Sequence, residues 1–364
     1  MKVVAFSAGQ WRVLDPSSEI PSGDDLVWVA LERPDWIDPQ TRRQELVSRL
    51  AGTPLLDVHA KDLANASHPS HFEATSVYDR VCFRGLPQSA GAVASPATDG
   101  VLLPSQGVGM AIFNRLLVSV HPPDCRFASD LVERLTTDAR PGGDAPVIRM
   151  RRPQNPTELA LHLVNTMVDS FIELRKQLAS QLEQAQSLLL RPRPDAALWP
   201  ILMHARQRLH ALQALCEDQQ DAMQEWLDTL HEMPLPSDAP SLLQAQLQRD
   251  QVLARARDVA QHVDRLLHHA NRLERSAETA VQIHFNAQGQ RTNDTMRALT
   301  AITAVFLPLN LFTGFFGMNF DHLPLIHSGP GMWIALALLF VLALAIVALF
   351  WQRRYLWNGP RPDP

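Results

Sequence analysis

The 364-residue chain has few cysteines and lacks the short motifs by which common enzymes are recognised. Its three cysteines, Cys82, Cys125 and Cys216, are odd in number and widely spaced, so neither a disulfide framework nor a Cys-x-x-Cys zinc site is indicated. The chain has no glycine-rich phosphate loop, no His-Glu-x-x-His helix and no Gly-x-Ser-x-Gly elbow. We therefore expect a protein that is not an enzyme and whose thiols lie in a reducing compartment.

An excess of positive charge is also missing. The formal net charge is −5 at pH 7, and this argues against nucleic acid as a partner because proteins that bind nucleic acid usually carry a basic surface. The first fifteen residues lack the sustained apolar run of a signal peptide. We therefore expect the N-terminal region to stay in the cytoplasm.

Charge is missing above all from two stretches near the C-terminus. Residues 298–318 and residues 332–351 contain no Asp, Glu, Lys or Arg. A helix needs about twenty apolar residues to cross the hydrocarbon core of a bilayer, and both stretches meet this length. The alternative is a pair of buried helices in a soluble protein, but uncharged runs of this length are rare in soluble folds. The sequence therefore predicts two transmembrane helices and the lipid bilayer as a partner.

Basic residues lie on the outer flanks of these two stretches. Arg291 and Arg297 precede the first stretch, Arg353 and Arg354 follow the second, and the connecting loop 319–331 contains no Lys or Arg. Basic residues near membrane spans stay in the cytoplasm. We therefore expect a multi-pass protein of the inner or plasma membrane, with both termini cytoplasmic and the loop outside.

The region before residue 152 has the pattern of an α/β domain. Apolar and β-branched residues predict strands over 26–31, 77–86 and 109–120. Apolar residues at helical spacing predict a helix over 40–51.

Three long helical patterns follow. They cover residues 157–190, 199–233 and 241–318, and the third contains about 78 residues, far more than the usual helix of a globular protein. Asn155 or Thr157 can cap the first of them. A helix as long as the third needs partners along its apolar stripe.

These patterns together predict an α+β membrane protein with an N-terminal α/β domain, long coiled-coil-like helices and two transmembrane helices. The predicted division is a cytoplasmic α/β domain over 1–152, a long helical stalk over 153–296 and a membrane domain over 297–364.

Polar residues of the first span fall on one face of the helix. Asn and Thr are unfavourable in lipid unless they face protein or water. They therefore either line a water-filled pore or hold helices together, and the pattern leaves both open. The second span has no polar face, which is typical of an outer helix, and a closed pore would need several identical subunits. Steps of three and four residues select this face: Asn293, Met296, Thr300, Thr303, Leu307, Asn310, Gly314 and Gly317.

The segment Asn293 to Phe320 resembles the CorA family of magnesium channels and its relative ZntB. The resemblance extends more loosely to His68 to Asp79, to the strand ending in Leu-Leu-Val-Ser-Val-His and to the long helices. The residues that carry it are Asn293, Met296, Leu299-Thr300, Pro308, Gly314 and Gly317-Met318-Asn319.

This resemblance implies a funnel-shaped homopentamer that conducts divalent cations passively. It implies that Gly317, Met318 and Asn319 form the selectivity filter for hydrated Mg²⁺, with Co²⁺, Ni²⁺ and Zn²⁺ as further candidate ions. Mg²⁺ releases its water reluctantly, so a filter of amide and carbonyl oxygens suits it. Further rings along the pore would come from Asn293, Met296, Leu299, Thr300, Thr303, Leu307, Asn310 and Gly314.

Charged residues outside the stripe offer further candidate sites. Asp258 lies where the family can place a regulatory cytoplasmic Mg²⁺ site, and a solvated charge is the alternative. Asp321 follows the filter motif and can attract cations, or it is a solvated loop residue. His262 and His269 share a helical face and can bind a softer metal, or they are packing residues.

Two other functions remain open at this level. One is a ZntB-like zinc transporter, which would use the same architecture for another ion. The other is a membrane-tethered metal sensor or scaffold that does not conduct ions.

Overall fold

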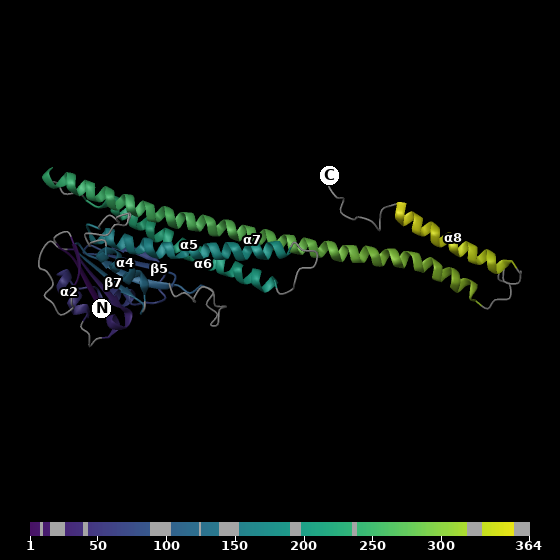
Figure 1. Cartoon of the computed structure of the whole chain (residues 1–364), viewed down its shortest axis with the longest axis horizontal. Coiled ribbons are helices and arrows are strands. Elements are labelled where there is room, and N and C mark those ends of the chain that lie inside the picture. Colours follow the sequence, from purple (N-terminus) through teal and green to yellow (C-terminus); the bar gives the residue numbers. More distant parts are fainter. Residues whose placement is uncertain are drawn as a thin grey trace. The chain divides into compact units, whose positions relative to one another are not determined.

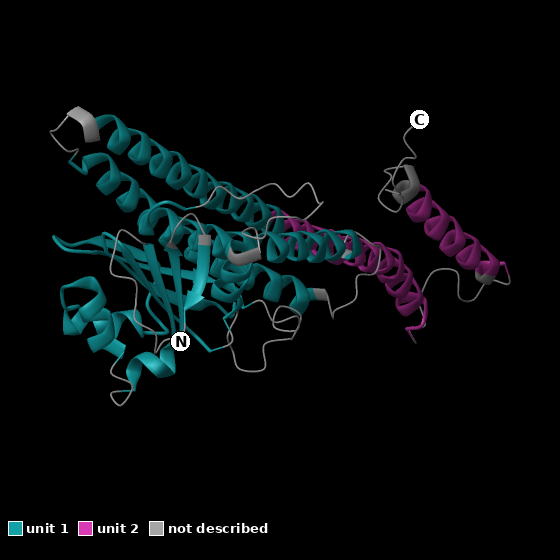
Figure 2. Ribbon diagram, turned by 60° about the vertical axis from the view of Figure 1, so that its left-hand side comes forward, with its two compact units in different colours: residues 1–278 teal, residues 279–364 magenta. Residues whose placement is uncertain are grey.

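The structure is a computed structural model of the whole chain. It describes residues 1–7, 10–14, 26–38, 43–87, 103–123, 125–137, 153–189, 198–234, 239–318 and 330–352. The chain divides into two compact units, Met1–Glu278 and Thr279–Pro364 (Figure 2). The predicted boundary near residue 152 lies outside the described residues, so the three-part division stays a prediction.

Unit 1 is built on a seven-stranded sheet with the order β2-β1-β3-β7-β6-β5-β4 (Figure 1). Strands β3 and β7 are parallel, and all other neighbours are antiparallel. The strands are β1 (Lys2–Ser7), β2 (Gln10–Leu14), β3 (Leu26–Glu32), β4 (His71–Ala74), β5 (Asp79–Gly85), β6 (Gln106–Ile112) and β7 (Leu116–His121).

Strand β3 shows why the sheet is buried on both faces. Side chains alternate across a strand, so Trp28 and Ala30 join one apolar cluster while Val29 and Leu31 join the other. A strand covered on both faces is apolar throughout, and this explains its continuous apolar run. The strand predicted over 26–31 is thereby confirmed.

Three short helices cover one face of the sheet. They are α1 (Arg33–Ile37), α2 (Arg43–Ala51) and α3 (Asp57–Leu63). The buried Trp36 indole of α1 donates a hydrogen bond of 2.7 Å to the carbonyl of Ala60 in α3, which ties two of these helices together. The helix predicted over 40–51 is confirmed as α2 in its described part.

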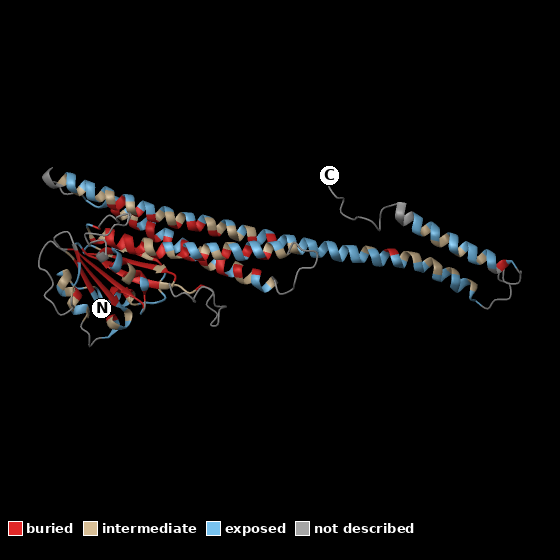
Figure 3. Cartoon of the chain, in the orientation of Figure 1, coloured by how far each residue is buried: buried red, intermediate tan, exposed pale blue. Residues whose placement is uncertain are grey.

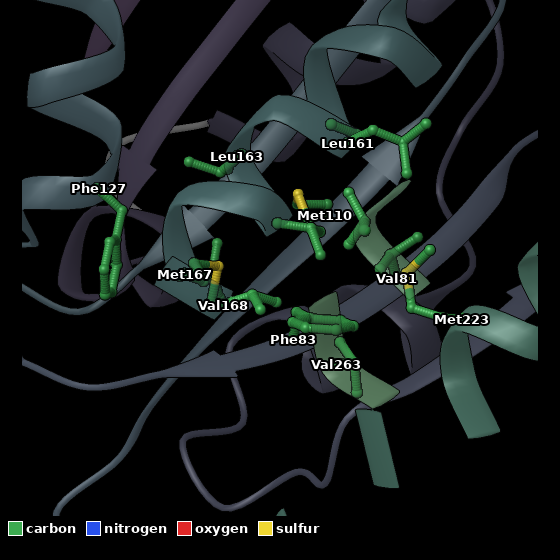
Figure 4. Packing of buried hydrophobic residues seen from close by; sticks show 14 of the residues in the cluster. Val81, Phe83, Met110, Phe127, Leu161, Leu163, Met167, Val168, Met223 and Val263 are labelled. Carbon is green, nitrogen blue, oxygen red and sulfur yellow. The ribbon is translucent and has the colours of Figure 1, made fainter. Parts of the chain in front are cut away.

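Longer helices cover the opposite face, where the larger apolar cluster lies. They are α4 (Arg126–Thr137), α5 (Pro156–Leu189), α6 (Leu198–Glu232) and the unit 1 part of α7 (Ala239–Phe316). Side chains of the strands, such as Phe83 and Met110, meet Met167 of α5 and Met223 of α6 in this cluster (Figure 4). The three predicted long helices are confirmed within one to two residues at each described end.

Two side chains cap the start of helix α5. The Asn155 side-chain oxygen accepts a hydrogen bond of 2.7 Å from the backbone N–H of Glu158, and the Glu158 carboxylate accepts one of 2.9 Å from the N–H of Gln154. The first bond satisfies a donor that the first helical turn leaves unpaired, and the second ties the residue before the cap to the helix. Asn155 is therefore the cap, and Thr157 is not.

The strand predicted over 109–120 is wrong as a single strand. The structure divides this segment into β6 and β7, which pair as an antiparallel hairpin with Ile112 opposite Leu117. The N–H of Phe113 donates a hydrogen bond of 2.8 Å to the carbonyl of Leu116, which leaves Asn114 and Arg115 at the turn. The loop is only two residues long and has apolar residues on both sides, so the apolar pattern looks like one continuous strand. Asn114 is the residue in it that is typical of a hairpin turn.

Unit 2 contains the second part of α7 and α8 (Gly331–Gln352). Most described residues of both helices are exposed (pale blue in Figure 3), and many of these exposed residues are apolar. Within α7, a stretch that is long and apolar enough to cross a membrane is only 6% buried. A core helix of a soluble protein would be mostly buried, so this stretch needs an apolar environment that the single chain does not supply.

Candidate functional site: the polar face of helix α7

The predicted pore-lining residues all belong to one uninterrupted helix. Helix α7 contains 78 residues and carries Pro308 in its interior. Proline has no backbone N–H, so the carbonyl of Ala304, four residues earlier, loses its regular helical partner. The regular hydrogen-bond pattern of α7 is therefore interrupted in the middle of its apolar stretch.

Described residues of the polar face are exposed in the single chain. Met296 and Leu307 are 59% and 65% exposed, and Asn293, Thr300 and Asn310 are also exposed. In the described part of unit 2 these side chains are therefore not used to pack α7 within its own subunit. The structure places the predicted residues along one helix, and it does not test whether they line a pore.

Two threonine hydroxyls bond back to the helix. Thr303 Oγ1 donates to the carbonyl of Leu299 at 2.9 Å, and Thr313 Oγ1 donates to the carbonyl of Leu309 at 3.0 Å. Such bonds satisfy the hydroxyl hydrogen within the helix. The lone pairs of the oxygen then remain available to accept hydrogen bonds from water.

Helix α7 ends at the predicted filter motif. The N–H of Gly317 donates to the carbonyl of Thr313 at 3.0 Å, and the N–H of Met318 donates to the carbonyl of Phe315 at 3.4 Å. The last carbonyls of a helix carry its negative dipole end, which favours cations. Asn319 and Asp321 lie outside the described residues, so their predicted roles stay predictions.

A side chain at position 317 would crowd this helix end. A Cβ atom on Gly317 would lie 3.1 Å from the carbonyl oxygen of Thr313, which is tighter than an ordinary contact. The neighbouring backbone would have to move by a few tenths of an ångström to accommodate this atom.

Asp258 lies on α7 within a group of polar side chains in unit 1. Its carboxylate is 3.9 Å from Nε2 of His262, and Nδ1 of His262 is 3.3 Å from the side-chain oxygen of Asn165 on α5. Asn165 in turn donates a hydrogen bond of 3.2 Å to Asp169. Burial and the negative charge of Asp258 raise the pKa of Asp169, while His262 and Arg134 oppose this shift.

Asp169 is a candidate ligand that the sequence reasoning missed. Its only signal was the spacing of Asn165 and Asp169, which places two polar groups on one face of α5. His269 has different surroundings, because it contacts the Arg272 guanidinium. Burial, Arg175 and Arg272 lower the pKa of His269, and such positive charge disfavours a bound cation.

Most of the chain matches the model of one protein family. Residues 31–354 match the family model described as CorA-like Mg²⁺ transporter protein. The chain belongs to the CorA family. This family consists of membrane proteins, which agrees with the exposed apolar stretch of α7.

Individual relatives are distant in sequence. The chain is 22% identical over 214 residues to the cobalt/magnesium transport protein CorA of Thermotoga maritima, a match that covers 58% of this chain and 55% of that protein. It matches over 77 residues the cobalt/magnesium transport protein CorA of Methanocaldococcus jannaschii, at 34% identity, which covers 21% of this chain and 24% of that protein. The matched parts thus span about half or less of these relatives.

Solved CorA and ZntB structures share the fold. The complete CorA magnesium transporter structure from Methanocaldococcus jannaschii superposes with a TM-score of 0.70 at 18% identity, over 96% of this chain and 97% of that one. The ZntB cytoplasmic domain of Vibrio parahaemolyticus superposes with a TM-score of 0.55 at 11% identity, over 80% of this chain and 98% of that one. This CorA-family chain therefore has an α/β domain followed by a long helix, as predicted.

Proposed function

We propose that this CorA-family chain forms a passive homopentameric channel for Mg²⁺, with Co²⁺, Ni²⁺ and Zn²⁺ as further candidate ions. The observation that carries the proposal is the exposed polar face of α7, which leads along one helix to Gly317 and Met318. Family membership and the names of the relatives, which are magnesium and cobalt transport proteins, support the choice of ion.

A rotationally symmetric arrangement would turn the polar face into a pore. Each subunit would contribute one copy of the face, and the side chains that one chain leaves exposed would then meet water or neighbouring copies. Five copies of the helix ends at Gly317 and Met318, together with Asn319, would surround the outer mouth. Backbone carbonyls and amide oxygens there would accept hydrogen bonds from the water shell of Mg²⁺ without removing it.

Polar and apolar rings would alternate farther in. Asn310 and Asn293 would form polar rings, and Thr300 and Thr303 would add oxygen lone pairs for hydrated ions. Apolar rings that can close a pore by excluding water would come from Met296, Leu299 and Leu307. Gly314 would leave space below the filter because it has no side chain.

Two membrane spans per subunit are part of the proposal. The apolar end of α7 would form the inner span, and α8, which is apolar on all sides, would form an outer span that faces lipid. Exposed apolar residues along α8, such as Trp333 and Phe340 at 69% and 65%, support this assignment. Both termini would be cytoplasmic, with Asp321 attracting cations outside.

A regulatory Mg²⁺ site at Asp258 is a second part of the proposal. Asp258 and Asp169 influence each other electrostatically, and His262 and Asn165 lie between α7 and α5 next to them. Two carboxylates and an amide oxygen are ligands that suit Mg²⁺. An ion there would relieve the repulsion between the two carboxylates.

The membrane potential is the expected driving force, since the sequence lacks a phosphate-binding loop for ATP. It contributes about 2.3 kcal/mol per elementary charge per 100 mV, and roughly double this for a divalent ion. Uptake into the cytoplasm is therefore favoured.

Ion flux into liposomes containing the full chain tests the proposal. We expect Mg²⁺ flux in the wild-type protein and its loss in Asn319→Ala, because the filter would lose its amide oxygen. In the same assay, Asp258→Asn should keep flux but weaken its inhibition by Mg²⁺ on the cytoplasmic side. Gly289→Ala, in open space on α7, serves as the control with unchanged flux.

The assay also separates the alternatives. Zinc flux that depends on a pH gradient, without magnesium flux, would favour a ZntB-like transporter. The absence of cation flux from well-folded protein would favour a sensor or scaffold and contradict the channel. Unchanged Mg²⁺ flux in Asn319→Ala would contradict the filter assignment.

A further inference from the structure

Two histidines and a cysteine come together at the edge of the sheet in unit 1, on residues that the proposed ion pathway does not use. They are His68, which precedes β4, His71, the first residue of β4, and Cys82 in β5. One possible ligand atom from each residue lies within 4.8 Å of the other two. All three belong to described parts of unit 1, so their arrangement depends on this unit alone.

The strand register places two of these side chains on the same face. His71 and Cys82 are direct partners in the antiparallel pair of β4 and β5. Side chains of directly opposed residues lie side by side, because their Cβ atoms are only about 4.5–5.5 Å apart. The pairing of the backbones therefore holds the imidazole and the thiol together before any ion binds.

Ring stacking and a hydrogen bond to its backbone carbonyl hold His68 next to this pair. Its imidazole stacks on that of His71, with ring centroids 4.2 Å apart and planes 24° from parallel. The guanidinium of Arg84 donates hydrogen bonds to the carbonyls of Ala66 and His68 at 2.8 and 2.9 Å. The segment that carries His68 is thereby fixed to β5.

The hydrogen bonds of the two rings leave ligand nitrogens available. Nδ1 of His68 and Nδ1 of His71 lie 3.2 and 3.4 Å from the carbonyl oxygen of Pro69, which can only accept. The other nitrogen, Nε2, then carries a lone pair, and a backbone carbonyl on Nδ1 is the arrangement that orients many metal-bound histidines. Nε2 of His71 is buried and has no hydrogen-bond partner among the described residues.

Nearby positive charge is partly neutralised. Arg80 donates hydrogen bonds to the carboxylates of Asp62, at 2.6 Å, and Glu73. Arg84 is occupied by backbone carbonyls and by the hydroxyl of Ser105. A thiolate at Cys82 would add a negative charge at the position of the ion.

We propose that His68, His71 and Cys82 form a binding site for a divalent transition-metal ion of the Zn²⁺ type in the N-terminal unit. Two imidazole nitrogens and one thiolate match the preference of Zn²⁺ and Co²⁺, whereas Mg²⁺ prefers oxygen ligands. Binding forms one metal–sulfur and two metal–nitrogen bonds, and the Cys82 thiol releases one proton to water. The site is separate from the proposed pore and does not depend on conduction.

The geometry requires a small contraction when the ion binds. Zn–S and Zn–N bonds of about 2.3 and 2.0–2.1 Å bring tetrahedral ligand atoms to about 3.3–3.6 Å from one another. The ligands are now within 4.8 Å, so shifts of about an ångström complete the site. Three protein ligands leave a fourth position for water.

Cobalt binding to the full-length protein in detergent tests the site, because Co²⁺ replaces Zn²⁺ and a thiolate ligand produces a charge-transfer absorption band. After treatment with a chelator, the wild-type protein should show this band with one Co²⁺ per chain, and Zn²⁺ should abolish it. Cys82→Ser should lose the band. Cys125→Ser and Cys216→Ser, which change cysteines outside the group, should keep it.

A second measurement tests the site even if Cys82→Ser does not fold. Zn²⁺ should raise the unfolding temperature of the wild-type protein, and this increase should vanish in His68→Gln and His71→Gln, because an ion that binds only the folded state stabilises it. Wild-type protein without the band, or a band that persists in Cys82→Ser, would overturn the proposal. A Zn²⁺-induced increase of the unfolding temperature that is as large in the two histidine variants as in the wild-type protein would do the same.

Discussion

At the scale of single residues, the carboxyl group of Asp79 shows how burial changes the chemistry of one side chain. Asp79 begins β5 and lines a cleft of about 430 Å³, together with Tyr78, which precedes this strand, and Arg249 of α7. Burial raises the pKa of Asp79 to about 6. The charged form of this group is therefore disfavoured in the folded chain.

This pKa predicts a pH-dependent loss of stability. An Asp in the unfolded chain ionises near pH 3.9, about two units below the folded value, so the folded chain binds the extra proton between these values. The stabilisation is complete below about pH 4 and is lost as the pH rises through about 6. Asp79→Asn removes this dependence and should raise the unfolding temperature relative to wild type more at pH 7 than at pH 5.

Thermal unfolding of the full chain in detergent at the two pH values measures this effect. Glu45→Gln, which changes an exposed carboxylate on α2, provides the matched control and should shift the unfolding temperature equally at both pH values. A difference between wild type and Asp79→Asn that is the same at pH 5 and pH 7 would contradict the assigned burial effect.

At the scale of secondary-structure elements, the close approach of α3 to the sheet depends on one glycine. A Cβ atom on Gly109 of β6 would lie 2.5 Å from the carbonyl oxygen of Leu63 at the end of α3. No real contact is this short, and the obstacle is backbone, which cannot rotate away as a side chain does. Helix α3 can therefore pack on β6 only where this residue has no side chain.

Gly109→Ala should thus destabilise unit 1 by about 1–3 kcal/mol, the usual effect of overpacking. Gly107→Ala is the matched control in the same strand, because its Cβ atom would lie at an ordinary 3.5 Å from the Arg84 side chain. The free energies of unfolding of the two variants, measured by denaturant titration, provide the comparison. Equal values would contradict the proposed contact.

At the scale of the whole molecule, unit 2 exposes more apolar surface than a soluble monomer tolerates. Lipid can cover the apolar sides of α8, but lipid does not satisfy Asn310 or Thr300 on α7. A second type of partner is needed for that face, and in the proposed channel copies of the same chain around a water-filled axis would provide it. The oligomer is thus required by the proposed pore.

The resemblance to the CorA family implies five subunits, so we expect the full chain in mild detergent to have the mass of a pentamer, measured by native mass spectrometry. The exposed polar face of α7 is the physical reason to expect an oligomer, since its side chains would be satisfied where the copies meet around water. Asn293→Leu, at the start of this face, should preserve the pentamer if pore lining rather than helix packing is its role. A monomer or dimer as the dominant species would contradict the pentameric channel.

Much of the candidate site could be predicted from the sequence because its signals are local. The uncharged stretches, the three- and four-residue spacing on α7 and the Gly317-Met318-Asn319 motif are all readable within a few helical turns. The hairpin of β6 and β7 was missed because Asn114 is a weak turn signal between apolar residues. The long helices were predicted closely because their apolar periodicity extends over many turns.

The sequence alone determined the length of the helices, the apolar stretches and the order of the polar groups along α7, because these depend on spacing along one chain. Only the tertiary structure brought together Asp169 with Asp258, and His68 and His71 with Cys82. These groups meet through helix packing and strand register, which join residues far apart in the sequence. The spacing of side chains along one helix or strand does not determine which other helix or strand that element will pack against.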